Sequence, residues 1–217
     1  MAAPKTKEKE APPAEAEAPV QKDEGEKKAA SARKWKGKDW YVVQAPDMFG
    51  GGDVGEIPAT DPETLMGRTL VVPLSQVTGN PSKYYQKLTF KVAEVKGSRA
   101  LTQFVGMRLA REHAFRLVRK RTAKVEVVTD VTTKDGWALH VKIVATTNRA
   151  VETEIQHKVR RKVVEMTAEI ASKFEMAEFI KQVCEDLHQK NIKKYASKIY
   201  PIRYCDVEKV EVMQRGK

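Results

Sequence analysis

Apolar and polar residues alternate most regularly between residues 85 and 96. Leu88, Phe90 and Val92 occupy one side of this segment, and Lys and Thr residues separate them. A period of two is typical of a strand with one buried face. Gly97-Ser98 follows directly and suits a two-residue hairpin turn. The turn predicts three facing pairs: Lys96 with Arg99, Phe90 with Val105, and Leu88 with Met107.

A second hairpin is predicted from residues 122–132 and 137–146, which both carry apolar residues at every other position. A two-residue loop between them would set Val131 against a polar position. A three-residue loop, Lys134-Asp135-Gly136, aligns the two apolar faces instead. It predicts that Val131 faces Leu139, that Val127 faces Ile143, and that Gly136 is left-handed within a G1 bulge.

After Thr147 the apolar period changes from two to 3.6, which indicates helices. The first helix, with Asn148 as its predicted N-cap, has the apolar stripe Ile155, Val159, Val163, Met166, Ile170 and Phe174. The second has the stripe Met176, Phe179, Ile180, Val183 and Leu187. A third helix is predicted from Asn191 to Pro201, and residues 203–213 have the pattern of a final strand.

The remaining elements complete an α+β pattern. Strands are expected at residues 39–45 and within 65–74, a loop with unusual backbone angles at 47–52, and one or two helical turns within 111–120. Strands come first, then helices, then one strand, so we expect an antiparallel, barrel-like sheet with C-terminal helices. Residues 33–217 are predicted to form a single domain. Residues 1–32 are mostly Ala, Pro, Glu and Lys, and we expect them to be a disordered tail.

Charge is distributed unevenly along the 217 residues, whose formal net charge is +11. Residues 83–124 contain 12 basic and 2 acidic side chains, whereas residues 39–82 contain 1 basic and 6 acidic ones. An excess of this size favours a polyanionic partner, with nucleic acid ahead of an anionic membrane surface. Neither 18 consecutive apolar residues nor an apolar N-terminal segment occurs, so we expect no membrane span and no secretory signal.

Three basic clusters are the candidate RNA-binding residues. A cluster taken alone fits a solvated charged face equally well, but the three together favour nucleic-acid binding. Trp35 and Trp40 alternate with cations, a combination that can stack on unpaired bases. The candidates are Arg33, Lys34, Trp35, Lys36, Lys38, Trp40, Arg108, Arg111, Arg116, Arg119, Lys120, Arg121, Lys158, Arg160, Arg161 and Lys162.

The sequence shows no set of residues that would support catalysis. Cys184 and His188 are four residues apart, but two ligands do not complete a zinc site. Gly50-Gly51-Gly52 lacks the Lys-Ser/Thr of a phosphate-binding loop. We therefore expect no enzyme activity, no metal and no cofactor, and we expect both cysteines to be reduced.

Five segments in order resemble a known ribosomal family. They are KDWY…APxMF at Lys38–Phe49, LTxFxGMxL at Leu101–Leu109, VRKxTxxIE at Val118–Glu126 (where Val125 replaces the usual Ile), DVxTxDGxxL at Asp130–Leu139, and KIYPIRxxxVxKVxV at Lys198–Val212. The chain thus resembles, from about Trp35 to Met213, the small-subunit ribosomal protein family of archaea and eukaryotes called e-S-one (older name S-three-a-e). An atypical tail and the lack of the longer eukaryotic C-terminal extension favour an archaeal member.

The resemblance implies a structural component of the small ribosomal subunit, without catalytic residues. Such a protein would lie on the platform near the mRNA exit, in a cytoplasmic ribosome. Its expected partners are small-subunit rRNA, neighbouring platform proteins, and mRNA near the exit. Two alternatives stay open: a free-standing RNA-processing enzyme or translation factor, and an adaptor that binds proteins through its amphipathic helices.

Overall fold

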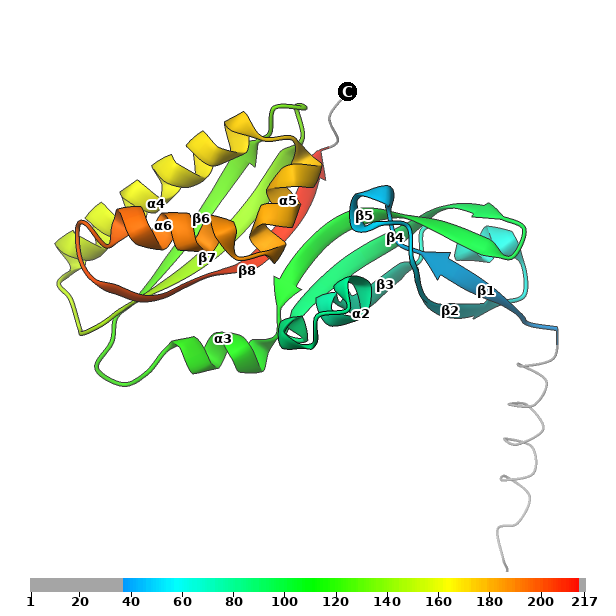
Figure 1. Ribbon diagram of the computed structural model, residues 1–217, viewed down its shortest axis with the longest axis horizontal. Helices are drawn as coiled ribbons and strands as arrows, with labels where there is room; N and C mark the ends of the chain where they lie inside the picture. Colours follow the sequence, from blue (N-terminus) through cyan, green and yellow to red (C-terminus); the bar gives the residue numbers. More distant parts are fainter. Residues whose placement is uncertain (1–36, 215–217) are drawn as a thin grey trace, which may run out of the picture. The chain divides into compact units, whose positions relative to one another are not determined.

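The computed structural model describes residues 37–214 (Figure 1). The predicted tail at residues 1–32 lies outside this range. The strands are β1 (Asp39–Gln44), β2 (Asp53–Ala59), β3 (Thr69–Pro73), β4 (Gln86–Lys96), β5 (Arg99–Leu109), β6 (Lys124–Thr132), β7 (Ala138–Thr147) and β8 (Ile202–Gln214). The α-helices are α2 (Leu74–Thr78), α3 (Arg111–Leu117), α4 (Thr153–Lys173), α5 (Met176–Cys184) and α6 (Leu187–Ala196). Short 3-10 helices occur at Asp47–Phe49, Pro62–Leu65 and Pro81–Lys83.

Strand β5 joins two parts of one mixed sheet. The sheet has the order β2-β1-β5-β8-β7-β6, and β4 pairs with β5 and with β3. Since β4 lies along one edge of β5, the other edge pairs with β1 near its start and with β8 near its end. The β1–β5 pairing is parallel and the other pairings are antiparallel. The α+β class is confirmed, with the helices and final strand in the predicted order.

The expected barrel-like closure of the sheet is wrong. In the described part of the chain β2 pairs only with β1, and β3 pairs only with β4. Pro58 in β2 and Pro73 in β3 have no N–H to donate, and proline is typical of edge strands. Side-chain hydrogen bonds join β2 to the residues on either side of β3. Gln76 Nε2 donates to the Val54 carbonyl at 2.8 Å, and Arg68 Nη1 donates to the Pro58 carbonyl at 3.3 Å.

The β4–β5 hairpin has the predicted turn but a different register in its middle. Lys96 faces Arg99 and Leu88 faces Met107, as predicted. Phe90 faces Phe104 rather than Val105, because β4 has an unpaired residue at Ala93. A second irregularity at Val105 restores the register before Met107. Two bulges of this kind cancel, so the turn geometry alone cannot reveal them.

The predicted register of the β6–β7 hairpin and the left-handed conformation of Gly136 are confirmed. Val131 faces Leu139, and Val127 faces Ile143. Gly136 has a φ of 76°, and its N–H donates to the Thr133 carbonyl at 3.0 Å. A residue with a Cβ is strained at such a φ, so Gly136 fixes the loop length and with it the register.

The helices carry the predicted apolar stripes, but their ends differ from prediction. Helix α4 begins at Thr153 with Glu152 at its N-cap position, so the predicted N-cap Asn148 is wrong; the Asn148 N–H donates to the Pro201 carbonyl at 3.2 Å instead. Asp186, with a φ of 62°, interrupts the predicted second helix, so Leu187 begins α6 and is 43% exposed. Helix α6 therefore starts before Asn191 and ends at Ala196, ahead of Pro201.

Helices α4, α5 and α6 cover one face of β6, β7 and β8 (Figure 1). The core between them contains Val159, Val163, Phe179, Ile180, Leu139, Val141, Ile143 and Val207, which are all at most 1% exposed. Burial of each such side chain contributes about 1.5–3 kcal/mol of transfer free energy. The α4 and α5 stripes are thus used within the chain itself.

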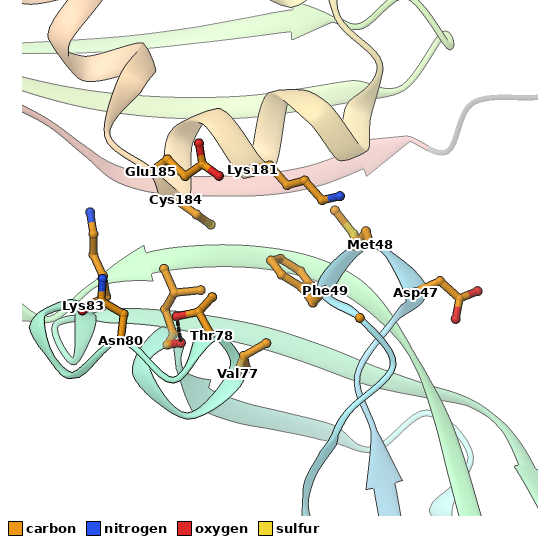
Figure 2. Close-up of a pocket in the computed structure, with 12 residues that line it drawn as sticks. Asp47, Met48, Phe49, Val77, Thr78, Asn80, Lys83, Lys181, Cys184 and Glu185 are labelled. Atoms are coloured by element: carbon orange, nitrogen blue, oxygen red, sulfur yellow. Dashed lines mark hydrogen bonds between the residues drawn. The ribbon is translucent and has the colours of Figure 1, made fainter.

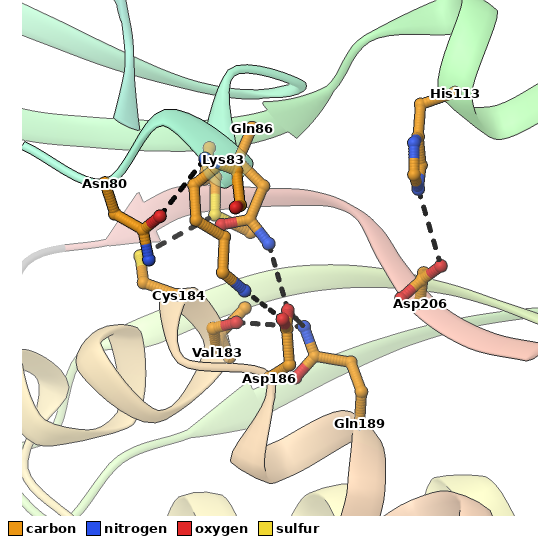
Figure 3. Close-up of polar contacts among 11 residues, drawn as sticks. Asn80, Lys83, Gln86, His113, Val183, Cys184, Asp186, Gln189 and Asp206 are labelled. Carbon is orange, nitrogen blue, oxygen red and sulfur yellow. Dashed lines mark hydrogen bonds and ion pairs between the residues drawn. The ribbon is translucent and has the colours of Figure 1, made fainter. Parts of the chain in front are cut away.

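A polar cluster connects residues 80–86 to the turn between α5 and α6 (Figure 3). Asp186 accepts from Lys83 and, at 3.1 Å, from Gln86 Nε2. Gln189 Nε2 donates to the Val183 carbonyl at 2.9 Å. Burial makes unpaired polar groups costly, so these bonds favour one arrangement of the turn.

Gly106 allows β5 and β8 to approach closely. A Cβ at this position would lie 2.5 Å from the Val210 carbonyl oxygen. Only three residue pairs join these two strands, Gly106–Glu211, Met107–Val210 and Arg108–Lys209. A side chain at the first of them would therefore disturb a large fraction of the junction.

We expect Gly106→Ala to lower the free energy of unfolding by about 1–3 kcal/mol, the usual cost of overpacking. Chemical denaturation monitored by circular dichroism measures the change. Gly52→Ala is the matched control, because a Cβ there meets no atom within 4 Å and should have little effect. Equal stabilities of the two variants would show that β5 and β8 can separate at no cost.

Candidate nucleic-acid interface

The predicted basic residues around α3 are all exposed. Arg111 and Arg116 lie on α3, and Arg119, Lys120 and Arg121 lie in the loop before β6. Thr122 fixes this loop, because its Oγ1 donates to the Arg119 carbonyl at 2.6 Å. Arg121 has a φ of 63°, unusual for a residue with a Cβ. None of the five cations forms an ion pair within residues 37–214, so their charges remain available to an external anion.

Three segments converge at one end of the β6–β8 sheet, and the third of them includes most of α6 and the start of β8. The Thr147 N–H donates to the Ala123 carbonyl at 3.0 Å, and its Oγ1 donates to the Arg149 carbonyl at 2.6 Å. The Asn148 N–H donates to the carbonyl of Pro201, which lies in the third segment. We call segments 117–124, 147–151 and 190–205 the convergent surface. They contain ten Lys and Arg residues and no Asp or Glu.

Tyr204 shows how closely the cations of the convergent surface gather. Arg203 lowers the pKa of the Tyr204 phenol, first through a hydrogen bond and then through its charge, and Arg119 and Lys193 lower it further. The Arg203 guanidinium lies 5.4 Å from the centre of the Tyr204 ring. Lys193 Nζ donates to the Arg203 carbonyl at 2.7 Å. Cations from α6, from β8 and from the loop before β6 thus act on one phenol.

Sequence patterns did not single out Arg149, Lys193, Lys198 or Arg203. The excess of basic residues near the C-terminal end was a sequence signal for three of these four cations. It did not indicate that they lie near Arg119, from which they are distant in sequence. Lys198 lies over the Tyr195 ring, with its Nζ 5.2 Å from the ring centre. Phe115 was also missed, although it is 76% exposed between Arg111 and Arg116.

Two of the four cations in the predicted cluster on α4 are paired with carboxylates of the same chain, and a third is held by a backbone carbonyl. Lys158 pairs with Glu154 at 2.7 Å and Lys162 with Glu165 at 3.0 Å. Arg160 Nε donates to the Glu126 carbonyl on β6 at 3.0 Å. Among the described residues, Arg161 is the one member of the cluster for which no such contact is found. This arrangement favours a structural role for three of the four cations.

Arg108 belongs to a row of cations across four neighbouring strands. Direct cross-strand partners are Lys87 and Arg108, then Arg108 and Lys209, then Lys209 and Lys142. Met107 and Leu109 are buried, so the alternation of the strand places Arg108 on the opposite face of the sheet. Lys142 and Lys209 have carboxylate partners, Glu208 at 3.1 Å and Glu211 at 2.6 Å.

The N-terminal cluster is only partly described. Arg33, Lys34, Trp35 and Lys36 lie outside the described residues. Trp40 is 57% exposed on β1, and Lys38 precedes this strand. The structure thus leaves the predicted alternation of indoles and cations untested.

A cleft of about 760 Å³ lies between the loop at 47–50, α2 and the end of α5 (Figure 2). Met48, Phe49 and Val77 supply apolar walls, while Asp47 and Glu185 supply carboxylates. Burial raises the pKa of the Cys184 thiol to about 12, so this group is not a nucleophile at neutral pH. Lys83 and Lys181 also line the cleft, so its walls combine apolar side chains with charges of both signs.

Cys184 and His188 do not form a metal site. Cys184 ends α5, with its Sγ 3.9 Å from the Met107 Sδ, and His188 lies inside α6 with its ring against Phe179. Between residues 37 and 214, no group of three potential metal ligands occurs. Over the same range, no helix has an apolar run long enough to cross a bilayer.

These features define a class of protein. Among the described residues, cations without an ion pair gather on α3 and in the loop after it, a distribution typical of protein components of nucleic-acid assemblies. The Ribosomal S3Ae family model matches residues 26–216, and the chain belongs to this family. The match begins within the segment predicted to be a tail.

Archaeal relatives support the same assignment. The chain is 38% identical over 185 residues to the small ribosomal subunit protein eS1 of Methanopyrus kandleri, which covers 83% of this chain and 88% of the relative. It is 38% identical over 180 residues to that of Desulfurococcus amylolyticus, with 83% and 84% covered. For Archaeoglobus fulgidus the identity is 37% over 182 residues, with 83% and 86% covered. The chain is a structural constituent of the small ribosomal subunit and not an enzyme.

Asp206 lies under α3 and is partly buried. Its Oδ2 is 3.9 Å from His113 Nε2 (Figure 3), and the His113 ring stacks on Tyr85 with ring centres 3.9 Å apart. Burial, and after it the charge of Asp186, raises the pKa of Asp206 to about 6, while burial and Arg116 lower the pKa of His113. At neutral pH, His113 is therefore uncharged and does not neutralise the Asp206 carboxylate.

This burial predicts that Asp206→Asn stabilises the protein at pH 7. The folded state takes up a proton on Asp206 between about pH 4 and 6, whereas the unfolded state does not, so stability from this group falls as pH rises through that range. Asparagine has no carboxyl group to ionise, so this loss of stability does not occur. We expect Asp206→Asn to raise the free energy of unfolding by about 1–3 kcal/mol at pH 7 and to leave it unchanged at pH 4. Urea denaturation at both pH values measures it. A loss of stability at pH 7 would indicate a true ion pair with His113.

Proposed function

We propose that this protein binds small-subunit rRNA through the convergent surface and the exposed cations of α3. The observation that carries the proposal is the absence of Asp and Glu from the three segments that meet there, beside ten Lys and Arg residues. A solvated surface normally mixes both signs of charge. A surface with mainly one sign of charge attracts a polyanion, and segments from separate elements suit the irregular shape of folded RNA.

Binding would rest on phosphate contacts. Guanidinium groups such as those of Arg119 and Arg203 can hold a phosphate through two parallel hydrogen bonds. Each contact releases condensed counterions and carries little information about base identity. The expected role is therefore to position and stabilise folded rRNA by charge and shape.

The acidic N-terminal part is proposed to face neighbouring proteins. Asp47, Asp53, Glu56, Asp61 and Glu63 are all exposed, and like charges disfavour placing them on phosphate. The cleft beside Asp47 offers apolar side chains for such a contact. The family resemblance adds a location on the platform near the mRNA exit, where mRNA is a further partner.

The adaptor alternative is weakened by the packing of the helices. It required the amphipathic faces of α4 and α5 to be open to a partner. Val159, Val163, Phe179 and Ile180 are instead fully buried against the sheet of the same chain. The remaining alternative, a free-standing enzyme, does not agree with the family.

Sedimentation tests the proposal as a whole. In a sucrose gradient at high salt, the protein should migrate with the small subunit, because many phosphate contacts formed during assembly would hold it there. Free protein at the top of the gradient, beside intact subunits, would contradict stable rRNA binding.

Four cations near α3 provide a sharper test. The variant has Gln at four positions, Arg116, Arg119, Lys120 and Arg121. We expect the slope of log binding constant against log salt concentration for rRNA to become less steep by about 3, because each lost phosphate contact removes about 0.7 from the slope. Binding to different small-subunit rRNA fragments should weaken by similar factors. Filter binding at several salt concentrations measures both effects.

The matched control replaces Lys158 and Lys162 by Gln. These lysines have carboxylate partners within the chain, so the slope should change by less than about 1. Far-UV circular dichroism checks that both variants are folded. An unchanged slope in the folded quadruple variant would show that the α3 cations do not face RNA.

A further inference from the structure

A small hollow lies beside α3, on the face of the sheet opposite helices α4–α6. Its volume is about 250 Å³. The walls come from α3 and its flanking residues on one side and from β6, β7 and β8 on the other. The lining residues are Leu109, Arg111, Ala114, Phe115, Val118, Lys124, Val144 and Glu208.

Helical spacing directs one side of α3 toward this hollow. Arg111 and Phe115 are four residues apart, and Ala114 and Val118 continue the same side. Phe115 is 76% exposed, the highest exposure among the large apolar residues of the described chain. Val144, at 2% exposed, provides an apolar floor. An exposed aromatic ring thus stands at the edge of an apolar hollow.

Charged side chains of both signs line the hollow, and they differ in whether they have partners within the chain. Arg111 has no ion pair within the described residues, and Arg116 and Arg119 follow on the same segment. Lys124 is paired with Glu126, and Glu208 with Lys142 at 3.1 Å. A phosphate would therefore be attracted to Arg111 and to the arginines that follow it, while the Glu208 carboxylate would repel a phosphate and accept a hydrogen bond from an amino or hydroxyl group.

We infer that the hollow receives one unpaired rRNA base, which stacks on Phe115 while the adjoining phosphates contact Arg111 and Arg116. This inference rests on the proposed function, and it adds single-stranded or bulged nucleotides as the class of ligand. A volume of 250 Å³ is below the ~300–1,000 Å³ of sites for drug-sized ligands, so it suits a single planar group. Aromatic side chains with neighbouring Arg residues bind the faces of unpaired bases in this way.

Two synthetic hairpin RNAs test the inference with the full chain. One is fully paired, and the other carries a single bulged 2-aminopurine. The wild type should bind both, should bind the bulged hairpin more tightly, and should quench its 2-aminopurine fluorescence. Phe115→Leu keeps an apolar side chain but removes the aromatic face, and it should weaken binding of the bulged hairpin by about tenfold or more, the loss of one base–aromatic stack.

The controls separate stacking from charge and from general apolar exposure. Phe115→Leu should leave binding of the paired hairpin unchanged, and Phe115→Tyr should preserve binding of both hairpins. Val128→Ala changes another exposed apolar residue, which is 53% exposed on β6, and should affect neither. Equal losses for both hairpins in Phe115→Leu, or unquenched 2-aminopurine, would overturn the base assignment.

A photo-crosslinker at position 115 in assembled small subunits identifies the occupant directly. Crosslinks to rRNA support the inference, and crosslinks to a protein side chain would overturn it. The two proposals fail in different ways. Loss of the stacking effect with tight binding of both hairpins rejects this inference alone, whereas failure of the wild type to bind either RNA rejects the proposed function.

Discussion

The close approach of β5 and β8 is the constraint on which the rest of the structure depends. Because β4 occupies one edge of β5, the sheet can continue toward β7 and β6 only through three residue pairs at the end of the other edge. The absence of a side chain at Gly106 makes this contact possible. Helix α3 begins two residues after Leu109, so its position over the outer face of the sheet follows from the same contact.

Local pairing explains why similar runs of cations differ in availability. On α4, carboxylates three or four residues away lie on the same side of the helix and pair with Lys158 and Lys162. In the loop after α3, no acidic residue lies within that distance of Lys120, and the chain is not helical. Clusters that look alike in sequence thus have different free charge, and secondary structure decides which of them can attract phosphate.

The sequence predicted those parts of the fold that depend on neighbouring residues. Gly136 and the alternation around it were enough for the register of β6 and β7, because a three-residue loop leaves one alignment of apolar faces. The bulge at Ala93 could not be predicted, since a second irregularity at Val105 cancels it. The open edge between β2 and β3 was also missed, because closure depends on which distant strands meet.

The candidate site shows the same limit more strongly. Arg119, Arg149 and Arg203 are separated by at least 30 residues in sequence, and no periodicity connects them. What connects them is Thr147, a buried residue at the end of β7, which bonds to the Ala123 and Arg149 backbones while its neighbour Asn148 bonds to Pro201. Two of these bonds join backbone groups, which every residue has, and the third is made by the hydroxyl of a single threonine, so they leave little trace in the periodic pattern of side chains. The convergent surface is consequently a property of the folded sheet end, whereas the basic segment around α3 is visible in the sequence because its charges are contiguous.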